Sequence, residues 1–420
     1  MAVAVSGGSN GNVGTGFAGF SYEKEQIGAG MFSTGNSNLV NLFRLLGPSV
    51  LRIGGNTVDT GTWNAAGSGG VSGTTSPPDV NMLAAFLQAT GWRVLYGINL
   101  KTNSTSNAIS EAQYVANKLG SSLIAFEIGN EPDFYDSESA YQSAFNNYRN
   151  AILTAVPGAQ FDGPGASDHN PGWATTFGPA EKNNISMLTT HMYIGSNTGA
   201  TISGMLSSNS SGKLPNGEAT LGSAKSASGI PQWRMSEANS YFHGGASGVS
   251  NAQAAALWAL DFMYGIASHN GDGVNFHGGV SSQFTLYYSP IQFSGTMATG
   301  VQSVYFGELL WELAGPGALH SASVSGVSGV TAFGIGNNVI VNNKSSSVIK
   351  VTITLASGAS SGSEYVETAS SLSATSGITI AGSGVSANGT FTPSPIGVSV
   401  SGKTAVMSVP AGSAALLIVH

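Results

Sequence analysis

The chain has 420 residues, of which 41% are apolar and only 8% charged, with a net charge of −7 and no cysteine. This composition supports a sizeable core and excludes a disordered chain, disulfides, thiolate metal sites and cysteine nucleophiles. Lys and Arg form no cluster, which argues against a nucleic-acid partner. No apolar run approaches the roughly 18 residues of a membrane helix.

Apolar, β-rich runs recur along the first two thirds of the chain and alternate with segments of helical spacing. The helix-like segments include 81–91, 137–152, 251–268 and 297–314. This alternation predicts a parallel (β/α)8 barrel. A doubly wound open sheet is the alternative, but it would carry a nucleotide-binding loop, and the glycines near 67–73 follow no strand. The eight predicted strands are 16–22, 49–55, 92–100, 122–130, 159–166, 186–193, 231–237 and 272–279.

The pattern changes after about residue 317, where short Val, Ile and Thr runs are broken by Gly, Asn and Ser. These runs show no helical periodicity and predict an antiparallel β-sandwich over residues 317–420. No linker separates it from the barrel of residues 1–316, so the sandwich is expected to pack on the barrel. Residues 1–12 are candidates for an additional sandwich strand.

Polar side chains gather where the predicted strands end, and a (β/α)8 barrel carries its active site at the C-terminal ends of its strands. Inside the strands such side chains would be costly, so their placement indicates chemistry. They are Glu23, Arg52, Asp59, Asn130, Glu131, Tyr193, Glu237 and His277.

The stretch IAFEIGNEPDF (124–134) places Asn130 and Glu131 directly before Pro132. A residue that precedes proline is pushed towards an extended conformation. We therefore expect Glu131 to be extended at the end of the fourth strand, with its carboxylate directed into the mouth of the barrel.

Glu131 on the fourth strand and Glu237 on the seventh could face each other across the barrel mouth. Two such carboxylates suit glycoside hydrolysis, in which one donates a proton and the other attacks the anomeric carbon. Arg52 and Tyr193 are plausible donors that keep Glu237 ionised, and Asn130 could hold a sugar hydroxyl. Taken singly, Glu131 and Glu237 would more often be turn or strand-end residues, and Arg52 fits a structural salt-bridge partner. No closely spaced metal-binding triad is evident, so neither a metal nor a cofactor is expected.

The motifs together resemble glycoside hydrolase family 79, the group of β-glucuronidases and heparanases. The matching stretches are LRIGGNTVD (51–59), FEIGNEPDF (126–134), HMY (191–193), RMSEANSYFHGG (234–245) and GVNFHGG (273–279). The resemblance implies a barrel with a β-sandwich and hydrolysis with retention, with Glu131 as acid/base and Glu237 as nucleophile. It further implies that Asn130 binds the sugar 2-hydroxyl, Asp59 contacts ring hydroxyls and Tyr193 lies beside the nucleophile.

The resemblance also implies that loops after the seventh and eighth strands bind the uronate carboxylate. One departure concerns Phe242, because similar proteins carry tyrosine five residues after the nucleophile. The leading interpretation is an exo-acting β-glucuronidase, and a retaining β-glycosidase of a neutral sugar such as a β-glucoside is the alternative. The expected substrate-binding set is Glu23, Asp59, Asn130, Tyr193, Tyr241, Phe242, His243, Gly244, His277, Tyr287 and Tyr288.

Two further interpretations fit less well. A noncatalytic carbohydrate-binding protein would be expected to have lost at least one of the two glutamates. An endo-acting enzyme of a sulfated polymer would favour a basic cleft, and the 14 Lys and Arg residues are not clustered. We expect a monomer that is secreted or periplasmic and whose signal peptide is absent from this sequence, since MAVAVSGG lacks a basic region and a long apolar core.

Overall fold

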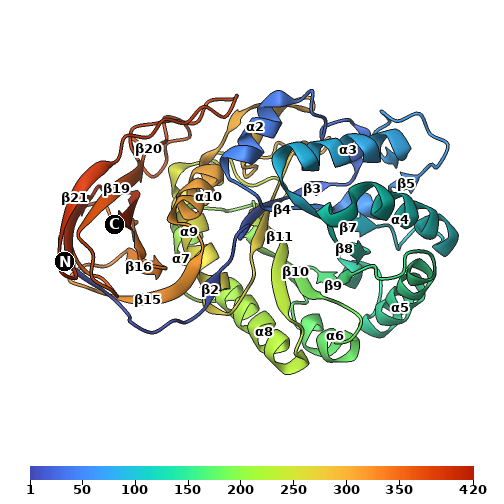
Figure 1. Ribbon diagram of the computed structural model, residues 1–420, viewed down its shortest axis with the longest axis horizontal. Coiled ribbons are helices and arrows are strands. Elements are labelled where there is room, and N and C mark those ends of the chain that lie inside the picture. Colours follow the sequence, from blue (N-terminus) through green and yellow to red (C-terminus); the bar gives the residue numbers. More distant parts are fainter.

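The computed structural model describes residues 1–420, and a closed barrel of parallel strands lies in its larger part (Figure 1). Each of the eight predicted runs overlaps one barrel strand, which confirms the (β/α)8 prediction. In chain order the barrel strands are β3 (Ala18–Glu23), β4 (Val50–Gly54), β7 (Arg93–Ile98), β8 (Leu123–Ile128), β9 (Phe161–Ala166), β10 (Met187–Ser196), β11 (Gln232–Phe242) and β12 (Val274–Gly278).

Helices follow the strands and surround the barrel (Figure 1). The predicted helical spacing within 137–152 is confirmed, because Tyr141, Phe145, Tyr148 and Ile152 are the buried residues of α5. The helices are α1 (Glu25–Gly28), α2 (Ser37–Leu45), α3 (Pro77–Thr90), α4 (Thr105–Leu119), α5 (Glu138–Ala155), α6 (Trp173–Glu181), α7 (Ile202–Ser207), α8 (Lys213–Ser228), α9 (Gln253–Ser268) and α10 (Ser303–Ala314), with 3-10 turns η1 (Asn56–Val58), η2 (Gly120–Ser122) and η3 (Pro132–Phe134).

The prediction of a helix from residue 297 was wrong for its first turn. Residues Met297–Val301 form the strand β14, which pairs with β13 (Ile291–Ser294) as an antiparallel hairpin beyond β12. Thr299, Gly300 and Val301 have low helix propensity, and the hairpin satisfies their backbone groups. The helix α10 begins only at Ser303. A second short pair, β5 (Thr62–Trp63) with β6 (Thr74–Thr75), follows β4.

The C-terminal quarter forms the predicted β-domain, and the chain's first strand belongs to it. β1 (Ala2–Val5) pairs with β15 (Gly317–Ser325) on one side and with β18 (Ile349–Thr354) on the other. It thereby closes the sheet order of this domain into a ring. The remaining strands are β2 (Asn12–Val13), β16 (Val330–Ile335), β17 (Asn338–Asn343), β19 (Ser361–Thr368), β20 (Thr379–Ile380), β21 (Ile396–Ser401), β22 (Thr404–Val409) and β23 (Ser413–Val419).

Helices α9 and α10 lie between the barrel and the β-domain (Figure 1). Nearly every residue of α9 is buried, because one face packs on the barrel and another meets β17. Buried polar contacts cross this interface: Asp261 of α9 pairs with Lys344, and Gln253 donates to a carboxylate oxygen of Glu367 at 2.8 Å. The two parts are therefore fixed to one another.

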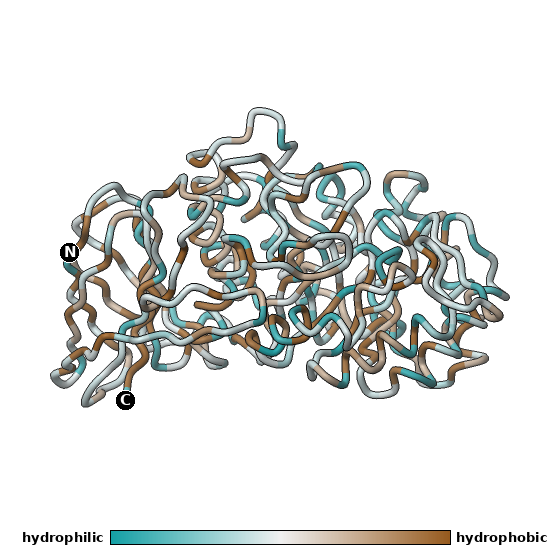
Figure 2. The backbone as a smooth tube through the Cα atoms, turned by 90° about the horizontal axis from the view of Figure 1, so that it is seen from above, coloured by the Kyte–Doolittle hydropathy of each residue, from teal (hydrophilic) through white to brown (hydrophobic).

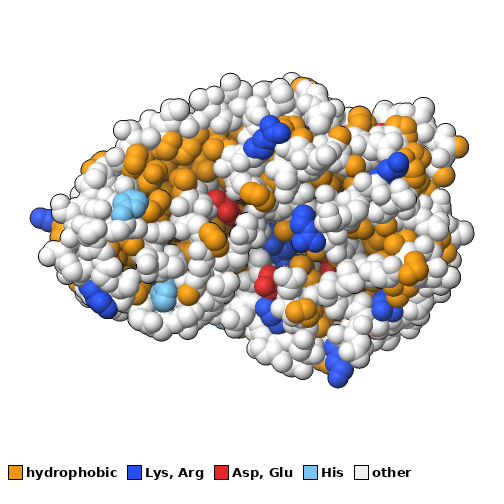
Figure 3. All heavy atoms as spheres, in the orientation of Figure 1, with side chains coloured by type: hydrophobic (Ala, Val, Ile, Leu, Met, Phe, Trp, Pro, Cys, Tyr) orange, Lys and Arg blue, Asp and Glu red, His pale blue; other side chains and the backbone are white.

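The molecule is elongated, and both chain ends lie in the β-domain (Figure 2). Lys, Arg, Asp and Glu side chains are scattered over the face seen in Figure 3 and form no large charged patch, as expected from a chain with 8% charged residues. None of the helices is both long and apolar enough to cross a bilayer.

Candidate active site

Glu131 lies just beyond the C-terminal end of β8, and its backbone differs from the sequence prediction. Its dihedral angles are φ 42° and ψ 55°, in the left-handed region instead of the extended one. The backbone hydrogen bonds explain the difference, because the Glu131 N–H donates to the Gly165 carbonyl and the Glu131 carbonyl accepts from Phe134, both at 3.0 Å. A non-glycine residue held in this region costs about 1–3 kcal/mol, and such strain is concentrated at functional sites.

The Glu131 carboxylate has one polar partner in the barrel. Its Oε1 lies 3.0 Å from Nδ1 of His191, a fully buried residue of β10. Burial raises the pKa of Glu131 above its usual value; His191 opposes this rise and the negative charge of Glu237 adds to it. Glu131 therefore keeps its proton at pH values at which an exposed glutamate would be ionised.

The surroundings of Glu237 on β11 favour its charged form, in contrast to those of Glu131. Arg52 donates to its Oε2 at 2.6 Å, the Tyr193 hydroxyl donates to its Oε1 at 2.8 Å, and His277 Nδ1 lies 3.6 Å from Oε2. Burial would raise the pKa of Glu237, but His277, His191, Arg52 and the Tyr193 hydrogen bond together hold it well below the usual range. Glu237 is therefore a carboxylate under ordinary conditions.

The two glutamates lie close together across the mouth of the barrel. One carboxylate oxygen of each and one ring nitrogen of His191 all lie within 4.8 Å of one another. Retaining glycosidases hold their two carboxyl groups about 5–5.5 Å apart, whereas inverting ones need about 6.5–9.5 Å. The spacing in this chain is thus closer to that of the retaining enzymes.

Glu131, His191 and Glu237 could ligate a metal in principle. However, Arg52 and Tyr193 already engage both Glu237 oxygens, and the guanidinium would repel a cation.

Arg52 of β4 is the centre of a buried network beneath the site. Besides Glu237 it binds Glu127 through Nε at 2.8 Å and Nη2 at 2.5 Å, and it donates to Asn130 Oδ1 at 2.9 Å. Burial alone would lower the pKa of Arg52, but Glu127 and Glu237 raise it above its usual value. The bond to Asn130 engages the amide oxygen and leaves its Nδ2 group for a ligand.

Sequence reasoning missed Glu127 and Asp162 beneath the site, and it noted His191 only within the motif HMY (191–193), without a role at the site. Glu127 and Asp162 are register neighbours on β8 and β9, both fully buried, and Asp162 has no hydrogen-bond partner on either oxygen. Burial and the nearby Glu127 raise the pKa of Asp162 well above its usual value. Both residues could have been found in the sequence as acidic residues within apolar runs, Glu127 in FEI (126–128) and Asp162 in FDG (161–163).

Glu23 and Asp59, both predicted from strand ends, lie beside the mouth with partners of their own. Glu23 accepts from the Thr57 N–H at 2.8 Å and lies 3.8 Å from His277 Nε2. Asp59 is buried with Oδ1 unpartnered, and its Oδ2 lies 3.7 Å from Nζ of Lys101. Burial raises the pKa of Asp59 to about 6.

Tyr193, Phe242 and Tyr288 form an aromatic cluster next to Glu237. The Tyr193 ring centroid lies 6.3 Å from that of Phe242 and 6.2 Å from that of Tyr288, which itself lies 6.1 Å from His277. Burial and the charge of Glu237 raise the pKa of Tyr193 well above its usual value, so its hydroxyl keeps its proton and donates. This cluster forms one side of the site.

The structure does not bring the other predicted residues to the two glutamates. The Tyr241 hydroxyl donates to the Thr201 carbonyl at 3.4 Å, and His243 is exposed and stacks on Phe284. Gly244 packs against Thr285, and the Tyr287 N–H donates to the Thr285 carbonyl. His243, Gly244 and Tyr287 belong to the outer loops of the barrel mouth, whereas Tyr241 is buried in β11.

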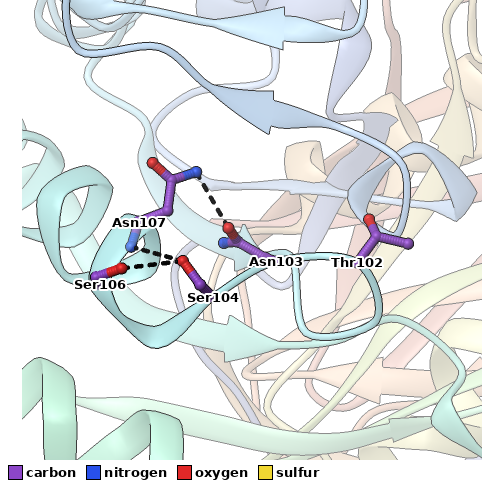
Figure 4. A pocket seen from close by; sticks show the side chains of 5 residues that line it. All are labelled: Thr102, Asn103, Ser104, Ser106 and Asn107. Atoms are coloured by element: carbon purple, nitrogen blue, oxygen red, sulfur yellow. Dashed lines mark hydrogen bonds between the residues drawn. The ribbon is translucent and has the colours of Figure 1, made fainter.

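Two surface hollows lie apart from the glutamates. Thr102, Asn103, Ser104, Ser106 and Asn107 line a shallow one of about 680 Å³, where Asn107 donates to Asn103 and Ser104 (Figure 4). A second, of about 440 Å³, lies between residues 279–289 and the β13–β14 hairpin. The first contains no ionisable side chain and the second none but Tyr287, so neither competes with the glutamate pair as a reaction centre.

No protein-family model matches the chain. In sequence it is similar to a β-glucuronidase from Aspergillus niger, with 27% identity over 323 residues, covering 66% of this chain and 59% of that protein. A β-glucuronidase from Neurospora crassa is 26% identical over 330 residues, covering 66% of this chain and 58% of that protein. The aligned part thus spans less than two thirds of these relatives.

Solved structures share the fold over the full chain. A 4-O-α-L-rhamnosyl-β-D-glucuronidase from Fusarium oxysporum 12S, in its Rha-GlcA complex, superposes with a TM-score of 0.81 at 21% identity, covering 100% of both chains. A family 51 α-L-arabinofuranosidase from Bifidobacterium longum gives 0.73 at 15% identity, covering 100% of this chain and 99% of that one. The chain is therefore similar to β-glucuronidases in sequence and has the barrel-and-β-domain fold of these glycoside hydrolases.

Proposed function

We propose that this relative of β-glucuronidases is itself a retaining exo-β-glucuronidase. The observation that carries the proposal is the glutamate pair, Glu131 just beyond β8 and Glu237 on β11: one carboxylate oxygen of each lies within 4.8 Å of the other, and their pKa values are displaced in opposite directions. Two titratable groups with pKa values pushed apart are the usual sign of an acid and a nucleophile. The sequence similarity supports glucuronide as the substrate.

In the first step the Glu237 carboxylate attacks the anomeric carbon while Glu131 gives its proton to the glycosidic oxygen. The bond between the anomeric carbon and that oxygen breaks, and the leaving group departs as an alcohol. Arg52 and Tyr193 hold Glu237 in one orientation through bonds of 2.6 and 2.8 Å. Asn130 Nδ2 is positioned to donate to the sugar 2-hydroxyl.

In the second step Glu131, now a carboxylate, takes a proton from water, whose oxygen attacks the anomeric carbon and displaces Glu237. The released sugar keeps its β configuration. His191 stabilises the carboxylate that Glu131 becomes between the two steps, because its Nδ1 lies 3.0 Å from Oε1. Two displacements at one carbon account for retention.

A neutral β-glycoside remains the second candidate, because one specific observation favours it. Phe242 lies beside Tyr193, at a position where the resemblance to family 79 implies a tyrosine, so a hydroxyl that could donate to the sugar carboxylate is missing. Leaving a charged group one hydrogen bond short costs on the order of 1.5–3 kcal/mol.

Matched 4-nitrophenyl β-glucuronide and β-glucoside separate the two candidates. We expect a strong preference for the glucuronide, measured as kcat/KM, and loss of hydrolysis in Glu131→Gln and Glu237→Gln. Preference for the glucoside would move the proposal to a neutral sugar. No hydrolysis of either substrate by the wild type would refute the proposed glycosidase activity.

We predict that Phe242→Tyr raises the preference for the glucuronide over the glucoside. The added hydroxyl supplies a donor to the uronate carboxylate, and a hydrogen bond to a charged group of this kind corresponds to about 10- to 100-fold in kcat/KM. The ratio of kcat/KM for the two substrates measures the effect. An equal change for both substrates would show that position 242 does not contact the carboxylate.

We predict a pH profile bounded by the two glutamates. Glu131 must be protonated in the first step, so activity falls as pH rises through its raised pKa; Glu237 must be ionised, so activity falls as pH drops through its lowered pKa. Tyr193→Phe removes a donor to Glu237 and should move only the acidic limb of kcat/KM to higher pH. Tyr148→Phe, whose hydroxyl donates to the Asn103 carbonyl, is the matched control.

A further inference from the structure

The loops after β8, β9 and β10 are joined into one wall on the Glu131 side of the barrel mouth. Asp133 accepts from the Ser167 N–H at 2.8 Å, from the Ser167 hydroxyl at 2.6 Å and from Asn170 Nδ2 at 2.9 Å. Asp168, in the same loop as Ser167, pairs with Lys213 of α8 at 2.6 Å. These charge-assisted bonds fix the three loops relative to one another.

Two aromatic side chains stand exposed on this wall. Phe134 has 62% of its surface exposed, and the His169 side chain has 60%. Their ring centroids lie 5.7 Å apart in an edge-to-face arrangement. Phe134 follows Glu131 by three residues within the turn η3. An exposed large aromatic ring held next to a reaction centre is a common feature of binding surfaces.

The proposed chemistry determines which part of a substrate meets this wall. Glu131 protonates the glycosidic oxygen, so the leaving group has to lie on the Glu131 side, while Glu237 attacks the sugar from the other. The loop that carries Phe134 begins at Glu131, and the loop that carries His169 follows β9, the barrel neighbour of β8. The leaving group therefore departs past the wall formed by these loops.

We propose that Phe134 and His169 bind the leaving group of the substrate and that this group is a planar aromatic alcohol. The wall offers an aromatic pair, and the two lysines found beside it are each paired with an acid, Lys213 with Asp168 and Lys101 with Asp59. A planar ring gains most from such a surface, whereas a sulfated sugar chain would find no free positive charge. This inference rests on the proposed function and specifies its substrate class.

Benzyl and cyclohexylmethyl β-glucuronides test the proposal, because both release an aliphatic alcohol and differ mainly in the flatness of the ring. Phe134→Ala should raise KM for the benzyl glycoside by about 2- to 10-fold, the range of one aromatic contact, with little change for the cyclohexylmethyl glycoside. Phe134→Tyr should restore the wild-type KM. Phe284→Ala, an exposed phenylalanine stacked on His243, is the matched control and should leave both KM values unchanged.

The outcomes separate this inference from the function on which it rests. Hydrolysis of both glucuronides with equal KM changes in Phe134→Ala would overturn the aromatic surface and leave the glucuronidase proposal intact. If the wild type hydrolyses only β-glucosides, the KM values are measured with benzyl and cyclohexylmethyl β-glucosides instead. Phe134→Ala should then raise KM for the benzyl glucoside alone. Hydrolysis of none of the four compounds would overturn both proposals.

Discussion

Glu237→Ala will lower kcat for an aryl β-glycoside by on the order of 10⁴-fold or more, the largest effect expected of any substitution in this chain. The variant lacks the atom that attacks the anomeric carbon, while Arg52 and Tyr193 still shape the pocket. Glu138→Gln, on the first turn of α5, is the control, and it should retain wild-type turnover.

Azide added to the variants distinguishes the two glutamates. In Glu237→Ala, azide can occupy the space of the lost carboxylate and attack the anomeric carbon once, which gives an α-glycosyl azide. In Glu131→Ala the glycosyl-enzyme still forms from a substrate with a good leaving group, and azide then displaces Glu237 to give a β-glycosyl azide. The configuration of each product is read by NMR. The reverse pattern would exchange the proposed roles.

Arg52→Met will destabilise the fold and disable the nucleophile together. Removing the arginine leaves Glu127 and Glu237 charged in the interior, with Asp162 beside them, and breaking a buried pair in this way costs about 3–5 kcal/mol. Loss of its positive charge also raises the pKa of Glu237, so the acidic limb of the kcat/KM profile should move to higher pH. Chemical denaturation and the pH profile measure the two effects.

Arg234→Met is the control for the Arg52 variant. Arg234 is also buried in the barrel, but it donates to Asn275 Oδ1 and to backbone carbonyls, including those of Phe17 and Val274. We expect it to lower the free energy of unfolding without moving the acidic limb. Arg52→Lys keeps the positive charge, so its acidic limb should stay close to that of the wild type. Arg52→Gln removes the charge with a polar side chain and allows the pH measurement if the methionine variant does not fold. An unmoved acidic limb in both uncharged variants would contradict the role given to Arg52.

The barrel was predictable from sequence because apolar, β-rich runs alternate with segments of helical spacing. The same local signal failed at residues 297–301, where the pairing of β13 with β14 decides the conformation and the next helix begins only at Ser303. The Glu131 backbone was mispredicted for a related reason. Proline affects its neighbour locally, but bonds to Gly165 and Phe134 impose the left-handed conformation.

The candidate site was predictable for those residues that lie on predicted strands near the barrel mouth. Arg52 and Tyr193 could be assigned to Glu237 because all three lie on barrel strands at or near the ends. Glu127 and Asp162 lie deeper, and only the pairing of β8 with β9 and the crossing to β4 bring them under the site. Tyr241 lies near a strand end as well, yet its hydroxyl is directed at Thr201, since side-chain direction depends on packing that the sequence does not display.

The ring of the β-domain also sets an order of events during synthesis. The Met1 amino group donates to the Lys350 carbonyl, 349 residues away, and β1 lies between β15 and β18. β1 therefore cannot complete its pairing until synthesis has reached the last quarter of the chain, and such distant pairings fold slowly. A fragment of residues 317–420 would expose the unpaired edges of β15 and β18, which are templates for aggregation. Recombinant study of the β-domain alone would need β1 restored, for example by fusion to the C-terminal end.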